Sequence, residues 1–151
     1  MKTLANAADL NTIRRRIASL TAADNARWGS MYVGGMICHL TDSYKFGLGE
    51  KPAALLPPSP IPLPMLKWIA LRAPMKWPKG VPTLPEVKQG VGGTPPAEFA
   101  ADLAALLDSL DRFAACLGPW PRHPIFRDLT QTQWMRWGYL HADHHLRQFG
   151  R

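Results

Sequence analysis

The sequence predicts an all-α protein, because four stretches repeat their apolar residues at helical spacing and none of useful length alternates like a strand. Its 151 residues fit a single domain, residues 1–151, since domains usually run to about 100–200 residues. Hydrophobic residues make up 46% and charged residues 19%, as in ordinary globular proteins. We therefore expect a four-helix bundle around one hydrophobic core.

The first predicted helix covers roughly residues 4–20, and the second roughly residues 30–48. The third begins after Pro95 and Pro96 and ends before Gly118. One apolar stripe runs along it, formed by Phe99, Leu103, Leu106, Leu107, Leu110, Phe113, Ala114 and Leu117. This spacing of three and four residues is the pattern of a helix with one buried face.

The fourth predicted helix runs from Thr130 to Phe149, with Thr130 and Gln133 in capping-box positions.

Before the third helix lies a long connection, from Gly49 to Pro96, which holds twelve of the fifteen prolines. This proline density prevents a continuous helix or a central strand, although MLKWIALRA (65–73) predicts a short helix. The apolar residues of the connection favour an ordered loop docked on the bundle; they are Leu66, Trp68, Ile69, Leu71 and Trp77.

Charge and composition exclude several classes of protein. The net charge is +7, but the only basic run is Arg14–Arg16, which fans around a helix, so we expect no nucleic-acid partner. No segment approaches the roughly 20 apolar residues of a membrane span, and the N-terminus lacks a signal-peptide pattern. Cys38 and Cys116 are the only cysteines. We therefore expect a cytoplasmic protein without a disulfide or a membrane partner.

The histidines carry the functional signal. On the fourth predicted helix, at 100° per residue, His141 and His145 straddle the centre of the buried stripe, whereas His144 lies at its edge. His39 lies in the middle of the inward face of the second helix. Burying three imidazoles is costly unless each finds a partner, and a divalent cation satisfies all three. We predict that His39, His141 and His145 bind one metal ion, with zinc or nickel expected.

Simpler interpretations remain open for individual residues. A solitary core histidine such as His39 usually has a structural role, and a histidine near a helix C-terminus such as His144 interacts favourably with the helix dipole. His123, in the RHPIF loop, has a local structural role as its default. Cys38 lies about 100° around the helix from His39, so we interpret it as a small buried residue and not as a fourth ligand.

Three sequence blocks carry a resemblance to a known superfamily: RWGSMYVGGMICHLTDSYKFGLGE, MKWPKGVPTLPE and HPIFRDLTQTQWMRWGYLHADHHLRQFG. The arrangement resembles the DinB-like (YfiT-like) superfamily of metal-binding four-helix bundles, in a branch described only as a domain of unknown function. The resemblance implies an up-down-down-up bundle whose metal ligands fall on His39, His141 and His145. Arg27, Trp28 and the C-terminal Arg147–Arg151 are then expected to rim the site.

The function implied by the resemblance is metal-dependent chemistry on a small-molecule substrate. Enzymes of the superfamily use a three-histidine metal to activate a low-molecular-weight thiol in transferase and isomerase reactions. Asp42, one turn from His39, is the expected hydrogen-bonding partner or base. His144 and Gln148 are further candidates for contacts to the ligands or the substrate. We therefore expect a thiol-dependent transferase.

Two other functions stay open. The first is a non-catalytic bundle, in which the metal or the packed histidines hold the helices together while the protein acts through homodimerisation or partner binding. The second is a metal-dependent hydrolase, in which the same ligands activate water. Both alternatives use the same histidines, so the sequence alone does not discriminate between them.

Overall fold

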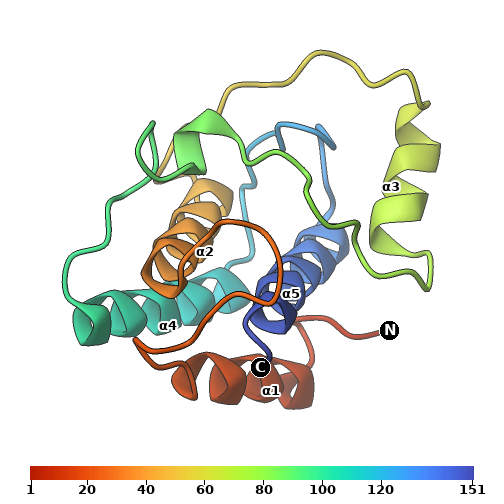
Figure 1. Ribbon diagram of the computed structural model, residues 1–151. Coiled ribbons are helices and arrows are strands. Elements are labelled where there is room, and N and C mark those ends of the chain that lie inside the picture. The colour runs from red at the N-terminus through yellow and green to blue at the C-terminus, as the bar shows by residue number, and fades with distance from the viewer.

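The computed structural model of the protein describes residues 1–151 and is all-helical, as expected. Its elements are α1 (Ala7–Ala18), α2 (Val33–Gly47), α3 (Leu63–Leu71), the 3-10 turn η1 (Pro85–Val87), α4 (Phe99–Ala115) and α5 (Gln131–Gln148) (Figure 1). Two isolated β-bridges occur, and neither belongs to a strand. No helix has the length and apolar composition that a membrane crossing needs.

Local capping sets where the helices begin. Asn6 precedes α1, and its side chain accepts hydrogen bonds from two backbone amides of the first turn. α1 is therefore shorter than the predicted 4–20, although Leu4 and Leu20 remain buried beside it. The predicted capping box of α5 is confirmed, since Thr130 and Gln133 exchange side-chain and backbone hydrogen bonds.

The prediction for the end of the third long helix was wrong in one detail. α4 ends at Ala115, and Cys116 adopts extended backbone angles, with φ −70° and ψ 132°. The chain thus leaves the helix before Leu117 can return to the inward face. Leu117 is 88% exposed and is not part of the core.

The four long helices pack in a closed ring of contacts, because α1 and α2 each lie against both α4 and α5. The buried apolar side chains form one cluster. Phe113, in the last turn of α4, is fully buried and packs on Tyr44 of α2, with ring centroids 5.0 Å apart. Gly47 and Gly138 let the helices approach, because a Cβ at either position would lie 2.5 or 2.6 Å from the Phe113 ring.

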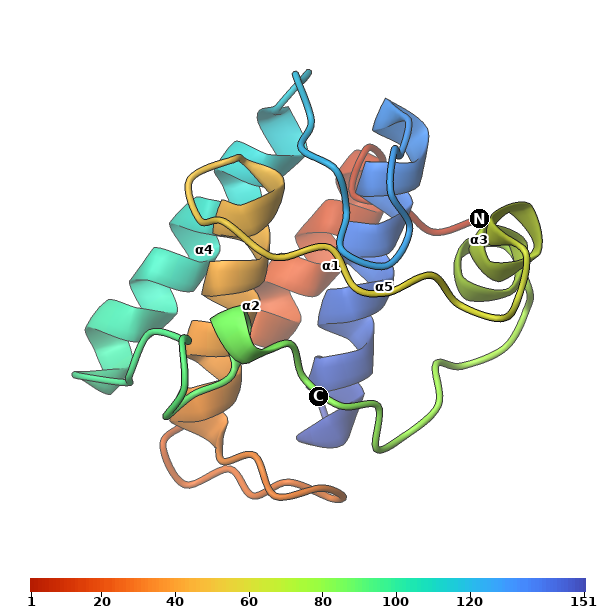
Figure 2. The ribbon, with the colours of Figure 1, turned by 90° about the horizontal axis from the view of Figure 1, so that it is seen from above.

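The proline-rich connection extends away from the four long helices and then returns to them. It carries α3 to the far side of α5 and then returns across α5 to η1, which lies beside α2 (Figure 2). Arg136 of α5 donates to the Leu71 carbonyl (2.9 Å), and the Trp77 indole donates to the Ala70 carbonyl (2.7 Å). The predicted short helix is confirmed two residues earlier than expected, but Trp68 is 56% exposed and does not dock.

Both cysteine thiols are free. Burial raises the pKa of Cys38 to about 11, and nearby acidic side chains add to this shift. Cys38 is therefore a neutral thiol at physiological pH, which fits its interpretation as a small buried residue.

Candidate metal centre

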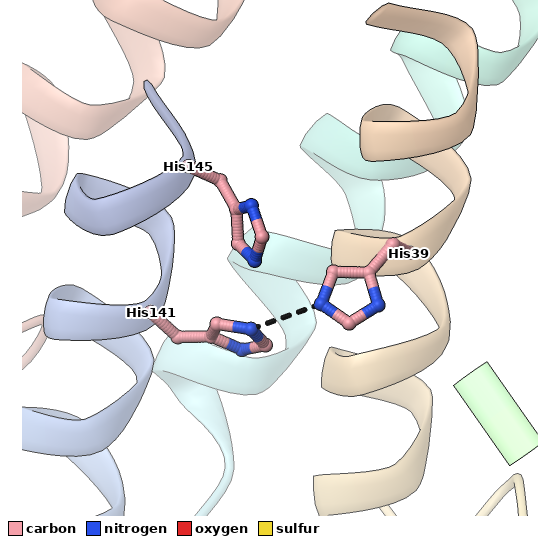
Figure 3. A group of neighbouring side chains, drawn as sticks. All are labelled: His39, His141 and His145. Carbon is pink, nitrogen blue, oxygen red and sulfur yellow. Dashed lines mark hydrogen bonds between the residues drawn. The ribbon is translucent and has the colours of Figure 1, made fainter. Parts of the chain in front are cut away.

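The structure brings together the three histidines singled out in the sequence. His39 comes from the middle of α2, and His141 and His145 come from successive turns of α5; the three rings point toward one another (Figure 3). One ring nitrogen from each lies within 4.8 Å of the others. A HxxxH pair and a facing histidine can therefore reach one common ion.

The protein sets the tautomer of His39. Its Nδ1 lies 3.0 Å from the Val87 carbonyl of η1. Because a carbonyl only accepts, Nδ1 carries the proton and donates, which leaves a lone pair on Nε2. Metal-binding histidines usually donate their second ring N–H to such an acceptor. The connection thus fixes the binding nitrogen of His39 through one backbone atom.

A glutamine sets the tautomer of His145 in the same way. Gln148 donates from Nε2 to the Trp28 carbonyl (2.8 Å), which orients its amide. Its Oε1 then faces Nδ1 of His145 at 3.0 Å and accepts the proton there. The lone pair of His145 is left on Nε2. Gln148 therefore fixes which ring nitrogen of His145 carries the proton.

His141 differs from the other two. Its Nε2 lies 3.0 Å from Nε2 of His39, and its Nδ1 is buried without a partner. Since His39 holds its proton on Nδ1, the hydrogen bond between them uses a proton on Nε2 of His141. Two imidazole nitrogens bound tetrahedrally at about 2.05 Å from one ion would lie about 3.3 Å apart. The observed pair is close to this separation, so the residues fit a metal ion.

Burial keeps these imidazoles uncharged. It lowers the pKa of His39, and it lowers the pKa of His141 and His145 well below the ordinary value, with the neighbouring histidines adding to the shift. Metal ligands must be deprotonated at the binding nitrogen. His39 and His145 therefore offer lone pairs on Nε2, and His141 offers one there when its ring proton moves to the unpartnered Nδ1.

Asp42 does not take the expected position beside a histidine. Its carboxylate accepts from the backbone amide and the hydroxyl of Thr94, at 2.7 and 2.8 Å, and pairs with Lys51 at 3.0 Å. Lys51 and Thr94 lie near the two ends of the proline-rich connection. Asp42 therefore ties the connection to α2, and its oxygens are already used.

A cavity of about 380 Å³ adjoins the three histidines, and most of its lining is apolar. Its walls come from α2, α5, the connection and the loop before α5. Trp77 of the connection packs on His141 and His144, with ring centroids 6.0 and 6.2 Å apart. His144 is half-buried, lines this cavity and leaves Nδ1 without a partner.

The expected rim is placed differently. Arg27 and Trp28 do not line the cavity. The guanidinium of Arg27 lies against Gly150, and the Trp28 ring contacts His144 and lies under Lys79. Trp28 therefore contacts the site in two ways, because its carbonyl accepts from Gln148 and its ring packs on His144.

Sequence reasoning missed three contributors to the site: the Val87 carbonyl, Trp77 and His123. A backbone carbonyl has no signal in a sequence. Trp77 was expected only to help dock the connection, and its place over the histidines depends on the path of the connection. His123 belongs to the cavity wall although its default interpretation was local.

No curated protein and no solved structure matches the chain. One family matches it over residues 2–151, almost its whole length. This match shows that the chain belongs to the family described as protein of unknown function (DUF1569).

Proposed function

We propose that this protein is a metal-dependent enzyme that acts on a small molecule, with thiol-dependent transferase chemistry at His39, His141 and His145. One observation carries the proposal: the three nitrogens lie in the wall of an apolar cavity of about 380 Å³. A structural ion usually has four protein ligands, whereas only three lie within reach here. This favours an enzyme over a bundle that uses the ion only for stability.

Zinc or nickel fits the donor set, because imidazole suits late first-row ions. A divalent ion held by three neutral imidazoles keeps its full charge and favours the thiolate form of a thiol that binds beside it. Such a transfer forms a bond from the thiol sulfur to an electrophilic carbon, and a leaving group departs from that carbon. The residues of the chain orient the two reactants and receive the thiol proton.

We propose that His144 receives the thiol proton. The ring lines the cavity next to His145, with ring centroids 5.1 Å apart, and burial lowers its pKa, so it is uncharged at physiological pH. A general base has to be unprotonated and within reach of the proton it accepts. Asp42 is held by Thr94 and Lys51 and is not free for this task. No Asp or Glu lines the cavity, which makes the hydrolase alternative less well supported.

The connection contributes the walls that separate the reactants from water. Trp77 covers His141 and His144, and apolar side chains from α3 and the loop before α5 complete the enclosure. Lys76 is the only Lys or Arg in the wall and is the candidate partner for a carboxylate of the thiol.

We also propose that α1, α2, α4 and α5 form a DinB-like bundle with up-down-down-up order. The closed ring of contacts among these four helices supports this arrangement, as does the long connection after α2, which a crossover requires.

Cobalt substitution tests the proposed chemistry. Protein purified without an affinity tag is loaded with cobalt and titrated with glutathione, cysteine and other small thiols. We expect a thiol to produce a sulfur-to-cobalt charge-transfer band. His144→Ala is expected to retain both cobalt and the band, whereas His141→Ala is expected to lose both. A spectrum that no thiol changes would contradict the proposal.

A further inference from the structure

His123 lies in a tight turn outside the three-histidine group. Its backbone exchanges two 2.8 Å hydrogen bonds with Arg127. The ring nitrogen Nδ1 accepts from the backbone amides of Ile125 and Phe126, at 3.1 and 3.2 Å. A backbone N–H only donates, so Nδ1 holds a lone pair and the ring proton must lie on Nε2. The turn itself therefore makes His123 a hydrogen-bond donor at its opposite edge.

The ring is also held in place. It packs on Phe126, Trp137 and Trp134, with ring centroids 4.7, 5.2 and 5.4 Å away, and the residue is only 4% exposed. This burial lowers the pKa of His123 to about 3, so the ring is uncharged at physiological pH. His123 is thus a rigid, neutral donor.

The donating edge of His123 has no partner within the protein, since its only side-chain hydrogen bonds are the two at Nδ1. The residue lines the same cavity as His39, His141 and His145. Nε2 is not fully buried, so it keeps surface that a bound molecule can contact. The two backbone N–H groups of the turn need only a hydrogen-bond acceptor, which an asparagine or aspartate side chain could also supply. The turn therefore gives no role to the Nε2–H group of His123.

We propose that the Nε2–H group of His123 binds an uncharged carbonyl-type oxygen of the substrate, and that the substrate is a small, mostly apolar molecule carrying such an oxygen. This inference rests on the proposed function only in placing the substrate in the same cavity. His123 contacts Trp137, which is one helical turn, or about 6 Å, before His141 on α5. A molecule of modest size can reach both the donor and the three histidines.

The surroundings of His123 select the type of acceptor. Phe46 and Phe126 flank the ring, and Phe46, Ile125 and Phe126 all belong to the cavity lining. A carboxylate placed against these apolar side chains would lose more hydrogen bonds to water than one N–H can replace, whereas a ketone, ester or amide oxygen needs only one donor. Ser43 does not compete, because its hydroxyl donates to the His39 carbonyl at 2.7 Å.

Two ligands of matched shape test this assignment: 2-acetonaphthone, which carries a ketone, and 2-isopropenylnaphthalene, which carries a CH2 group in place of the ketone oxygen. Their affinities are measured for the full-length protein, both zinc-loaded and treated with EDTA. We expect the wild type to prefer the ketone. His123→Phe should weaken ketone binding about 5- to 30-fold and change hydrocarbon binding less than about twofold. His123→Asn keeps an acceptor for the turn, lacks the Nε2 donor, and is expected to lose the same preference.

Ser43→Ala is the matched control, since this residue lines the cavity but has no free donor, and it should keep the ketone preference. The imidazole N–H resonance of His123 should shift with the ketone and not with the hydrocarbon. The inference is overturned if the wild type shows no preference, or if both His123 variants keep it. Because neither a thiol nor turnover is involved, a ketone preference that survives EDTA treatment stands even if the proposed transferase chemistry fails.

Discussion

Replacing Gln148 with methionine isolates the contribution of the contact that orients His145. Gln148→Met keeps a side chain of similar length but removes two hydrogen bonds, one from His145 Nδ1 (3.0 Å) and one to the Trp28 carbonyl (2.8 Å). Loss of such a supporting contact typically lowers metal affinity about 10- to 100-fold, or about 1.4–2.7 kcal/mol. We expect a loss in this range, measured by competition with a chromogenic chelator.

Gln131 offers a matched control on the same helix. Its side chain also joins a ring N–H to a carbonyl, accepting from Trp120 Nε1 (2.6 Å) and donating to the Cys116 carbonyl (2.8 Å). It lies about 21 Å along α5 from His145. Gln131→Met should lower the stability to a similar degree and leave metal affinity within about twofold. Equal losses of affinity in the two variants would refute the role given to Gln148.

Two further predictions concern stability. In metal-free protein, the free energy of unfolding should fall as the pH drops below about 6.5. The lowered pKa values keep His39, His141 and His145 neutral in the folded state, whereas the same rings take up protons in the unfolded chain. Each ring contributes up to about 1.4 kcal/mol per pH unit to this decrease. Urea unfolding at pH 5.5 and 7.5 measures the sum, and equal free energies of unfolding at the two pH values would contradict the burial of uncharged histidines. Gly47→Ala should destabilise the protein by about 1–3 kcal/mol in urea, because the added Cβ would lie 2.5 Å from a ring carbon of the fully buried Phe113; a change below about 0.5 kcal/mol would show that the ring can move.

The helical periodicity predicted most of the fold because each long helix buries one face against a single core. It located α2, α4 and α5 and the inward positions of His39, His141 and His145. It failed for Leu117, since where a helix ends depends on the backbone beyond its last turn, and Cys116 turns the chain outward.

The path of the proline-rich connection was not predictable from its composition. Proline excludes regular structure but does not say where the chain goes. The folded path decides which face of the histidine group is covered, and so it moved the expected entrance away from Arg27 and Trp28. It also explains the position of Asp42, because its partner Thr94 lies 52 residues away and reaches it only at the end of the connection.

Metal analysis of single-histidine variants tests the central claim most directly. Protein purified without an affinity tag is equilibrated with zinc, passed over a desalting column and analysed for metal per chain by mass spectrometry. The account predicts about one ion per chain in the wild type and in His144→Ala, and a sharp loss in His39→Ala, His141→Ala and His145→Ala. A wild-type protein that retains no metal, or equal losses in all four variants, would contradict it.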